Sequence, residues 1–319
     1  MNNCFFKVLR SGVNTTFQDK GRFGLQHLGV PPGGCMDFKS FLFANILLGN
    51  KDNCGAIEFA YQGPLLKLIN GKTKIVVTGD VYFKIINSNN EIIDGECNRT
   101  YDLMEGDQID ILATNKSVYG YLSVEGGFKI ESFYSSVSTL VKAKIGPNNG
   151  CKIANNDTII INRDRKSKKN LKVYISIPTN NVIRVLRGPQ YKYFSEESKK
   201  IFFSQLYKIT NLTDRMGMRL EGPVLNNIVN TNIRSEGITK GAIQIPADGQ
   251  PIILLSDHPT IGGYPKIANV ITADYDLLVQ KTPETNIAFK CIDLEEAENL
   301  NKYRHNNILK ITKDIREIK

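Results

Sequence analysis

The stretch from Asp214 to Pro223 reads D-R-M-G-M-R-L-E-G-P, and the stretch from Asp19 to Gly34 reads D-K-G-R-F-G-L-Q-H-L-G-V-P-P-G-G. Each has an Asp and then an Arg, one further residue, a Gly and an apolar residue, with Gly and Pro following shortly after. Similar segments surround them in the same order: K-V-L-R at 7–10 and R-V-L-R at 184–187 precede them, and G-A-I-E at 55–58 and G-A-I-Q at 241–244 follow. This spacing is far longer than that of a solenoid repeat. The pattern therefore predicts two homologous halves that fold as two similar domains.

Outside these segments the chain alternates short β-branched or aromatic runs with turns rich in Gly, Asn and Asp. Such spacing is typical of antiparallel β barrels and sandwiches. We expect strands at residues 74–78, 81–86, 108–112, 119–124, 158–161 and 173–177. Short helices are expected at 38–48, where Asp37 can cap the first turn and Gly49 can end the last, and directly after Ser195. The length of 319 residues agrees with two domains.

The net charge of +9 is concentrated in two segments. Residues 163–172 contribute +5 from six basic and one acidic side chain, and residues 302–319 contribute +4 from six basic and two acidic side chains. The rest of the chain is balanced, and no aromatic platform or zinc-module spacing accompanies the basic segments, so no nucleic-acid partner is expected. Ile308, Ile311 and Ile315 are spaced as in a short amphipathic helix that docks on the body of the protein or on a partner.

Several classes of protein are not supported by the sequence. Six cysteines are scattered without a C-x-x-C pair, and no apolar run approaches ~20 residues. Lys7 and Arg10 interrupt any apolar signal core near the N-terminus. These features predict a reduced, soluble, cytoplasmic protein without a membrane segment. The three histidines lack metal-ligand spacing, so no metal site is expected, and there is neither a G-x-S-x-G sequence nor a P-loop.

Residues 246–270 read P-A-D-G-Q-P-I-I-L-L-S-D-H-P-T-I-G-G-Y-P-K-I-A-N-V, and their short apolar run at 252–255 predicts a buried strand. Polar and Gly-rich loops flank it, with Asp248, Gly249 and Gln250 before it and Asp257, His258, Thr260, Gly262, Gly263, Tyr264 and Lys266 after it. A core strand with such loops at both ends can present a binding site. Tight turns that require Gly and Pro explain the same composition. This stretch alone leaves both interpretations open.

Six ordered blocks of sequence resemble a known family. They are T-T-F-Q-D-K-G-R-F-G at 15–24, H-L-G-V-P-P-G-G-C-M-D at 27–37, E-G-G-F at 125–128, R-V-L-R-G-P-Q at 184–190, D-R-M-G-M-R-L-E-G-P at 214–223, and D-G-Q-P at 248–251 with G-G-Y-P-K at 262–266. They resemble the family of biotin-dependent carboxyltransferases and allophanate hydrolase subunit 2, and within it the C-subunit type of bacterial 5-oxoprolinases, also described as KipA-like. The resemblance implies a mainly β chain of two cyclophilin-like β-barrel domains with a few short helices, at 1–180 and 181–292, followed by a basic C-terminal tail at 293–319.

The same resemblance implies a function that the chain does not perform alone. It implies work with an A subunit and a KipI-like B subunit in the ATP-dependent opening of 5-oxo-L-proline to L-glutamate. ATP is then a cofactor of the complex, whichever subunit binds it. Two alternatives stay open: a carboxyltransferase subunit acting on a urea-like amide, which would need biotin on a separate carrier, and a non-catalytic KipA-like regulator that binds its partner.

The chemistry of a lactam acid indicates which side chains such a site needs. The carboxylate needs a cation, the developing oxyanion needs N–H donors, and the ring-nitrogen proton needs a carboxylate. The expected catalytic residues are Asp257, Lys266 and Glu221. The expected substrate-binding residues are Arg215, Arg219, Gly33, Gly34, Gln250, His258, Gly262, Gly263 and Tyr264. Carboxyl transfer to an amide nitrogen needs nearly the same groups, so residue types do not separate the two reactions.

Overall fold

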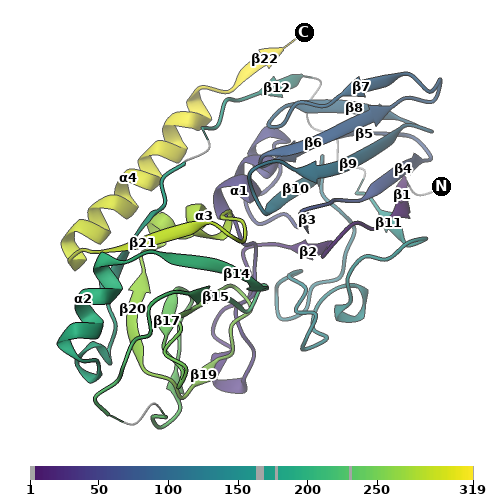
Figure 1. Ribbon diagram of the computed structural model, residues 1–319. Coiled ribbons are helices and arrows are strands. Elements are labelled where there is room, and N and C mark those ends of the chain that lie inside the picture. Colours follow the sequence, from purple (N-terminus) through teal and green to yellow (C-terminus); the bar gives the residue numbers. More distant parts are fainter. Residues whose placement is uncertain (1–3, 163–168, 177–178, 230–231, 319) are drawn as a thin grey trace. The chain divides into compact units, whose positions relative to one another are not determined.

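The computed structural model describes residues 4–162, 169–176, 179–229 and 232–318. The chain forms two compact units (Figure 1). Unit 1 comprises residues 1–22, 33–177 and 308–319, and unit 2 comprises residues 23–32 and 178–307. Strands dominate both units, which confirms the predicted mainly β class.

Two large antiparallel sheets form the body of unit 1. The six-stranded sheet has the order β11-β1-β4-β9-β6-β7, and the five-stranded sheet has the order β2-β3-β10-β5-β8. The strands of the first sheet are β1 (Phe5–Arg10), β4 (Leu65–Ile69), β6 (Val81–Ile86), β7 (Ile92–Asp94), β9 (Gln108–Thr114) and β11 (Thr158–Ile160). Those of the second are β2 (Thr16–Gln18), β3 (Ala56–Ala60), β5 (Lys72–Thr78), β8 (Thr100–Met104) and β10 (Tyr119–Val124). A short 3-10 helix, η2, spans Asn148–Gly150.

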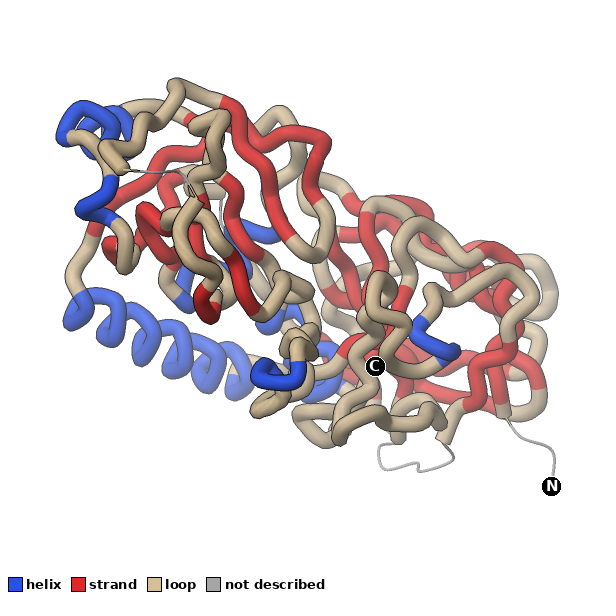
Figure 2. The backbone as a smooth tube through the Cα atoms, turned by 90° about the horizontal axis from the view of Figure 1, so that it is seen from below, coloured by secondary structure: helices blue, strands red, loops and turns tan. Residues whose placement is uncertain are grey.

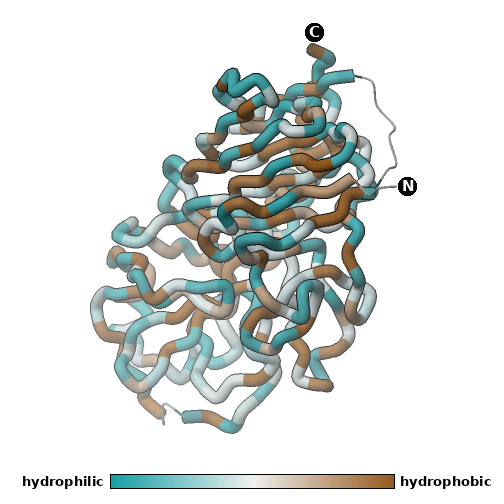
Figure 3. The backbone as a smooth tube through the Cα atoms, turned by 90° about the vertical axis from the view of Figure 1, so that its right-hand side faces the viewer, coloured by the Kyte–Doolittle hydropathy of each residue, from teal (hydrophilic) through white to brown (hydrophobic). Residues whose placement is uncertain are grey.

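Alternation along the strands places the core of unit 1 on one side of the six-stranded sheet. In β1, Phe6 and Val8 are fully buried while their neighbours are partly exposed, and hydrophobic and hydrophilic residues alternate visibly along these strands (Figure 3). Strands β3 and β10 are buried at every position. In β10, Leu122 belongs to the cluster between the sheets, whereas Tyr121 packs in a second cluster with α1. Both strands are therefore covered on both faces, although β3 carries Glu58 and β10 carries Ser123.

Helix α1 (Phe38–Leu47) covers the five-stranded sheet, and its ends follow the predicted signals. The Asp37 carboxylate accepts from the Ser40 N–H at 3.0 Å, which caps the first turn. Gly49 has φ +64° and donates its N–H to the Ile46 carbonyl at 3.0 Å, which ends the last turn. Ile308, Ile311 and Ile315 pack against the cluster that α1 forms. Their helical spacing was the sequence signal for a docking helix.

Unit 2 is built around a closed barrel with the strand order β13-β20-β17-β18-β15-β14-β21. Its strands are β13 (Val182–Arg187), β14 (Tyr207–Thr213), β15 (Gly217–Glu221), β17 (Ala242–Gln244), β18 (Ile252–Leu254), β20 (Lys266–Val270) and β21 (Asn286–Cys291). A separate two-stranded ribbon pairs β16 (Glu236–Gly237) with β19 (Ile261–Gly262). Short 3-10 helices span Gln26–Leu28 (η1) and Tyr191–Tyr193 (η3). The predicted buried strand at 252–255 is confirmed as β18.

Three α-helices belong wholly or largely to unit 2 and appear in blue in Figure 2. They are α2 (Glu196–Ser204), α3 (Thr272–Val279) and the long α4 (Leu294–Lys313). Ser195 caps α2 by accepting from the Ser198 N–H at 3.1 Å, as the sequence predicted. Ala297 of α4 packs with Ile271 and Ile292. Among the described residues, no helix has the length and apolar character needed to cross a bilayer.

Both basic segments contain regular secondary structure within their described residues. Residues 173–176 form no strand, so the predicted strand at 173–177 is wrong over its described part; the strand there is β12 (Asn170–Lys172). It pairs with β22 (Arg316–Ile318) from the C-terminal segment, and such a long-range pairing leaves no local pattern. Residues 294–318 of the basic C-terminal tail form α4 and β22, and α4 contains Ile308 and Ile311 of the expected amphipathic helix. Residues 163–168 of the first basic segment lie outside the described residues.

Candidate functional site

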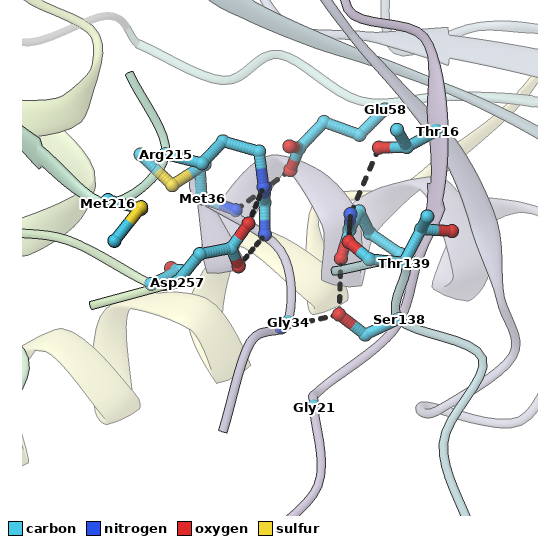
Figure 4. A network of polar contacts seen from close by, with 12 residues as sticks. Thr16, Gly21, Gly34, Met36, Glu58, Ser138, Thr139, Arg215, Met216 and Asp257 are labelled. Atoms are coloured by element: carbon cyan, nitrogen blue, oxygen red, sulfur yellow. Dashed lines mark hydrogen bonds and ion pairs between the residues drawn. The ribbon is translucent and has the colours of Figure 1, made fainter. Parts of the chain in front are cut away.

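A nearly buried ion pair joins Arg215 and Asp257 in unit 2 (Figure 4). The guanidinium donates from Nε to Oδ2 and from Nη2 to Oδ1, both at 2.8 Å. The Asp257 N–H also donates to the Arg215 carbonyl at 2.8 Å. The two side chains are only 8% and 13% exposed. A bidentate pair fixed by both backbone and side chain holds the carboxylate in one orientation.

The loop that carries Arg215 is shaped by its own first residue. Asp214 Oδ1 accepts from the N–H groups of Met216 at 2.7 Å and Gly217 at 3.2 Å. This is the turn-forming arrangement typical of Asp, and it starts β15. The D-R-M-G sequence thus makes the turn with its Asp and presents the Arg.

His258 follows Asp257 and is 2% exposed. Its Nδ1 lies 2.7 Å from the Pro259 carbonyl oxygen. A carbonyl oxygen can only accept, so Nδ1 carries the proton and Nε2 is the unprotonated nitrogen. Burial lowers the pKa of His258 below its ordinary value of 6.5. The imidazole is therefore neutral at neutral pH.

Lys266 lies at the other end of the barrel from the Arg215–Asp257 ion pair. It is opposite Gln244 of β17, and Gln244 is opposite Ile252 of β18. Arg219 is also opposite Ile252. Lys266 and Arg219 are thus at the end where β18 begins, whereas Asp257 follows the end where β18 stops. The structure does not bring the predicted catalytic residues Asp257 and Lys266 into one cluster.

Lys266 has its own polar surroundings. Its Nζ lies 2.6 Å from Oε1 of Glu236 and 3.5 Å from the Tyr264 carbonyl oxygen. Gln190 Oε1 accepts from the Lys266 backbone N–H at 3.2 Å, and Gln190 Nε2 donates to Glu236 at 2.7 Å. Hydrogen bonds from Lys266 and then Gln190 lower the pKa of Glu236. Sequence reasoning missed Glu236, which no motif marks.

The other predicted residues of unit 2 are engaged elsewhere. Arg219 pairs with Asp248, and Glu221 pairs with Lys208 at 3.0 Å on an exposed face. Gln250 accepts from the Gly222 N–H at 2.8 Å and donates to the Gly222 carbonyl at 3.0 Å, which is a structural role. The last three predicted residues, Gly262, Gly263 and Tyr264, lie on or beside the β16–β19 ribbon. Gly262 is opposite Glu236, the Gly263 carbonyl accepts from the Ile233 N–H, and the Tyr264 side chain is 40% exposed.

In unit 1, Gly33 and Gly34 adopt positive φ, at +64° and +88°. The Gly34 N–H donates to Ser138 Oγ at 2.8 Å, and Ser138 Oγ donates to Gln18 Oε1 at 2.6 Å (Figure 4). Gln18 Nε2 in turn donates to Thr16 Oγ1 at 2.9 Å and to the Thr139 carbonyl at 3.1 Å. The N–H of Gly34, an expected substrate-binding residue, is therefore already hydrogen-bonded within this network.

A second buried group of unit 1 was not expected from the sequence. The Glu58 carboxylate accepts from the Met36 N–H at 2.8 Å and from the Tyr121 hydroxyl at 2.6 Å (Figure 4 labels Met36 and Glu58). Tyr121 Oη also accepts from the Asp37 N–H at 2.8 Å. Burial, followed by the charge of Glu58, raises the pKa of Tyr121 well above its usual range. Glu58 ends the G-A-I-E segment, so the internal repeat was its one sequence signal.

Cavities in unit 1 lie apart from these residues. One of about 320 Å³ lies beside Phe17, Phe133 and Ile159, and another of about 260 Å³ lies beside Cys4, Thr73 and Glu125. None of the predicted site residues lines either cavity.

The chain is similar in sequence and fold to carboxyltransferase-domain proteins. Residues 28–291 match the family described as "Carboxyltransferase domain, subdomain A and B". The chain is 33% identical over 295 residues to the C subunit of the 5-oxoprolinase of Haemophilus influenzae, covering 92% of this chain and 94% of that protein. It is 30% identical over 295 residues to the protein of the same name from Escherichia coli, covering 91% and 92%. The solved structure of the K. lactis urea amidolyase superposes with a TM-score of 0.88 at 28% identity, covering 97% of this chain and 20% of that one.

Proposed function

This chain belongs to the carboxyltransferase-domain family, subdomains A and B, and from that premise we propose that it is the C subunit of an ATP-dependent 5-oxoprolinase. Such an enzyme opens the ring of 5-oxo-L-proline to give L-glutamate. The proposal is supported by two relatives that are named as C subunits of 5-oxoprolinases and that align with this chain over more than nine-tenths of their own length. The resemblance seen in the sequence blocks is confirmed at the level of the family.

The observation that carries the proposed chemistry is the bidentate pair of Arg215 and Asp257. Each oxygen of Asp257 accepts one bond from the guanidinium and keeps a lone pair for another donor. Ring opening adds water across the bond between the lactam carbonyl carbon and nitrogen, so the nitrogen gains a proton. A carboxylate held in one orientation is suited to accept a hydrogen bond from the ring N–H and to relay a proton from the attacking water to the nitrogen as the carbon–nitrogen bond breaks. Glu221, the other predicted carboxylate, is paired with Lys208 on an exposed face, so we assign proton handling to Asp257.

Neutral His258 is suited to accept a hydrogen bond from the substrate beside Asp257. With its Nδ1 proton held by the Pro259 carbonyl, its Nε2 accepts a hydrogen bond. It would add an acceptor next to the carboxylate without adding charge. Its role is therefore to position a donor of the substrate.

The proposal includes partners and a location. We infer that A and B subunits complete the site and that the chain has no turnover alone. ATP activates the lactam in the complex, and we assign no step with ATP to residues of this chain. A cytoplasmic location is part of the proposal, because none of the six cysteines, all of them within the described residues, forms a disulfide.

One observation favours a second candidate. The superposition on a urea amidolyase structure covers 97% of this chain, which supports a subunit that transfers a carboxyl group to a urea-like amide nitrogen. Biotin on a separate carrier would supply that carboxyl group. The Asp257 carboxylate would then accept an amide N–H in the same way.

Separate assays with the two substrates distinguish the two candidate functions. The complex reconstituted from this chain and its candidate A and B subunits is offered 5-oxo-L-proline with ATP, or urea with labelled bicarbonate, ATP, a biotin carboxylase and a biotinylated carrier. Glutamate without incorporation of label supports the oxoprolinase. Label in a urea-derived product, without glutamate, rejects it in favour of carboxyl transfer.

A further inference from the structure

A lysine is buried under an exposed carboxylate at the end of the unit 2 barrel where β18 begins. Lys266 is 4% exposed at its side chain, whereas its partner Glu236 is 43% exposed. Glu236 comes from β16, which, within the described parts of the chain, pairs with β19 and not with a barrel strand. The cation thus belongs to the barrel, and the anion that covers it belongs to a separate ribbon.

The same place holds a buried donor without an acceptor. Gln244 is 5% exposed, and its Nε2 has no hydrogen-bond partner among the residues that the structure describes. A side chain added at Gly262 would come within 2.6 Å of that nitrogen, so the β19 backbone lies directly against it. A buried amide donor without an acceptor is costly, and natural structures rarely leave one. The donor is satisfied if an acceptor enters when β19 moves.

Glu236 and Gly262, which cover Lys266 and Gln244, both belong to the β16–β19 ribbon. Glu236 masks Lys266, Gly262 abuts Gln244, and these two ribbon residues lie directly opposite each other in the β16–β19 pair. Moving the ribbon therefore uncovers the cation and the amide donor together. Gln190, 7% exposed, stays on the barrel side and presents its Nε2, which now bonds Glu236.

We propose that Lys266, Gln190 and Gln244 form a binding site for a small carboxylate that also carries an amide carbonyl, and that Glu236 holds this site closed as an internal substitute for the ligand. The ligand's carboxylate replaces that of Glu236 at Lys266 Nζ and Gln190 Nε2, and its carbonyl oxygen accepts from Gln244 Nε2. A lactam acid such as 5-oxo-L-proline has both groups, and here it would occupy a site separate from the one at Asp257, because Lys266 lies at the other end of the barrel. Its identification as the ligand rests on the proposed function, whereas the carboxylate site itself does not.

The direct test is calorimetric titration of the full chain with N-acetylglycine and with 5-oxo-L-proline, using 2-pyrrolidinone as a probe without a carboxylate. Glu236→Gln removes the competing charge and should tighten binding of both acids about 10-fold. The double variant Glu236→Gln/Lys266→Met should lose that gain. Glu196→Gln, which removes the charge of an exposed ion pair with Lys199 on α2, is the matched control and should bind as the unchanged chain does. None of the proteins should bind 2-pyrrolidinone comparably.

The inference is overturned if Glu236→Gln binds the acids no more tightly than the unchanged chain, or if the double variant binds as tightly as Glu236→Gln, with thermal unfolding showing that both variants are folded. A simple stapling role for the Lys266–Glu236 pair predicts those results. The two proposals fail separately. A complex that makes no glutamate refutes the proposed function, while tighter binding of N-acetylglycine by Glu236→Gln would still support the carboxylate site.

Discussion

Asp257 and Arg215 form an ion pair that is both bidentate and nearly buried. Their side chains are about nine-tenths removed from solvent. In such surroundings the carboxylate loses much of its hydration, so the guanidinium both stabilises it and orients it. The same pair therefore contributes to stability and to the proposed handling of the ring-nitrogen proton.

Asp257→Asn should affect both properties. Loss of the charge should lower the free energy of unfolding by about 2 kcal/mol, because a partly desolvated guanidinium loses its charged partner. Glutamate formation by the complex should fall about 100-fold, the usual contribution of a positioned proton-handling group. Turnover is measured well below the unfolding temperature, with Asp248→Asn as the stability control, since its pair with Arg219 is exposed and worth under about 1 kcal/mol. Full turnover in folded Asp257→Asn would remove Asp257 from the mechanism.

His258 should make stability depend on pH. Its folded pKa lies below the ordinary 6.5 because burial disfavours the charged imidazole. The unfolded state therefore binds more protons just below pH 6.5, so this contribution to stability is complete above that pH and is lost as pH falls toward the folded pKa. His258→Asn should flatten the slope of the unfolding free energy between about pH 5 and 7. His305→Asn, at an exposed position of α4, should keep the slope; equal slopes in both variants and the unchanged chain would refute this assignment.

At the scale of elements, α4 shows how a basic, largely polar segment forms a packed helix. Ile308 is 6% exposed and packs in the cluster of α1, whereas the next residue, Leu309, is 49% exposed. Charged residues occupy the outward face, and the apolar ones are spaced by helical turns. Packing of one face, not composition, makes this segment a helix.

Ile308→Ala should therefore lower the free energy of unfolding by about 3 kcal/mol, from lost burial and the cavity left against α1. Leu309→Ala is the matched control at the adjacent, exposed position and should change it by less than about 0.5 kcal/mol. Denaturant unfolding followed by circular dichroism measures both. Similar losses in the two variants would mean that the helix does not dock through the Ile308 face.

Local signals predicted local structure well. The strands at 81–86 and 119–124 and the cap of α1 by Asp37 follow from alternation and capping chemistry, which act within a few residues. The strand predicted at 173–177 failed because β12 depends on pairing with β22, which lies about 145 residues away along the chain and leaves no local pattern.

The site was predicted only as a set of candidates. Motifs selected Arg215, Asp257 and Lys266, but strand register decides that the first two pair and that Lys266 lies at the opposite end of the barrel. Glu236 and Gln244 were missed because neither stands in a motif with a known role. Gln244 ends the G-A-I-Q segment, so the internal repeat was the sequence signal available for it.

At the scale of the whole molecule, the two units share a sequence order but differ in architecture. Unit 2 closes its strands into a seven-stranded barrel, and unit 1 pairs its strands in separate sheets of six and five. The repeated Asp-Arg-Gly segment nevertheless shapes a loop in each: Asp19 accepts from the Gly21 N–H at 2.8 Å, as Asp214 does from Met216. Homologous turns can thus present different side chains for different uses.

The central claim is that this chain is a required, non-autonomous subunit of a 5-oxoprolinase. The most direct measurement is glutamate formation from 5-oxo-L-proline and ATP by the candidate A and B subunits, with this chain, without it, and with its Asp257→Asn variant. The account predicts glutamate only when the unchanged chain is present and strongly reduced turnover with the variant. Equal glutamate formation by A and B alone, or none from all three when the subunits are shown to bind one another, would contradict it.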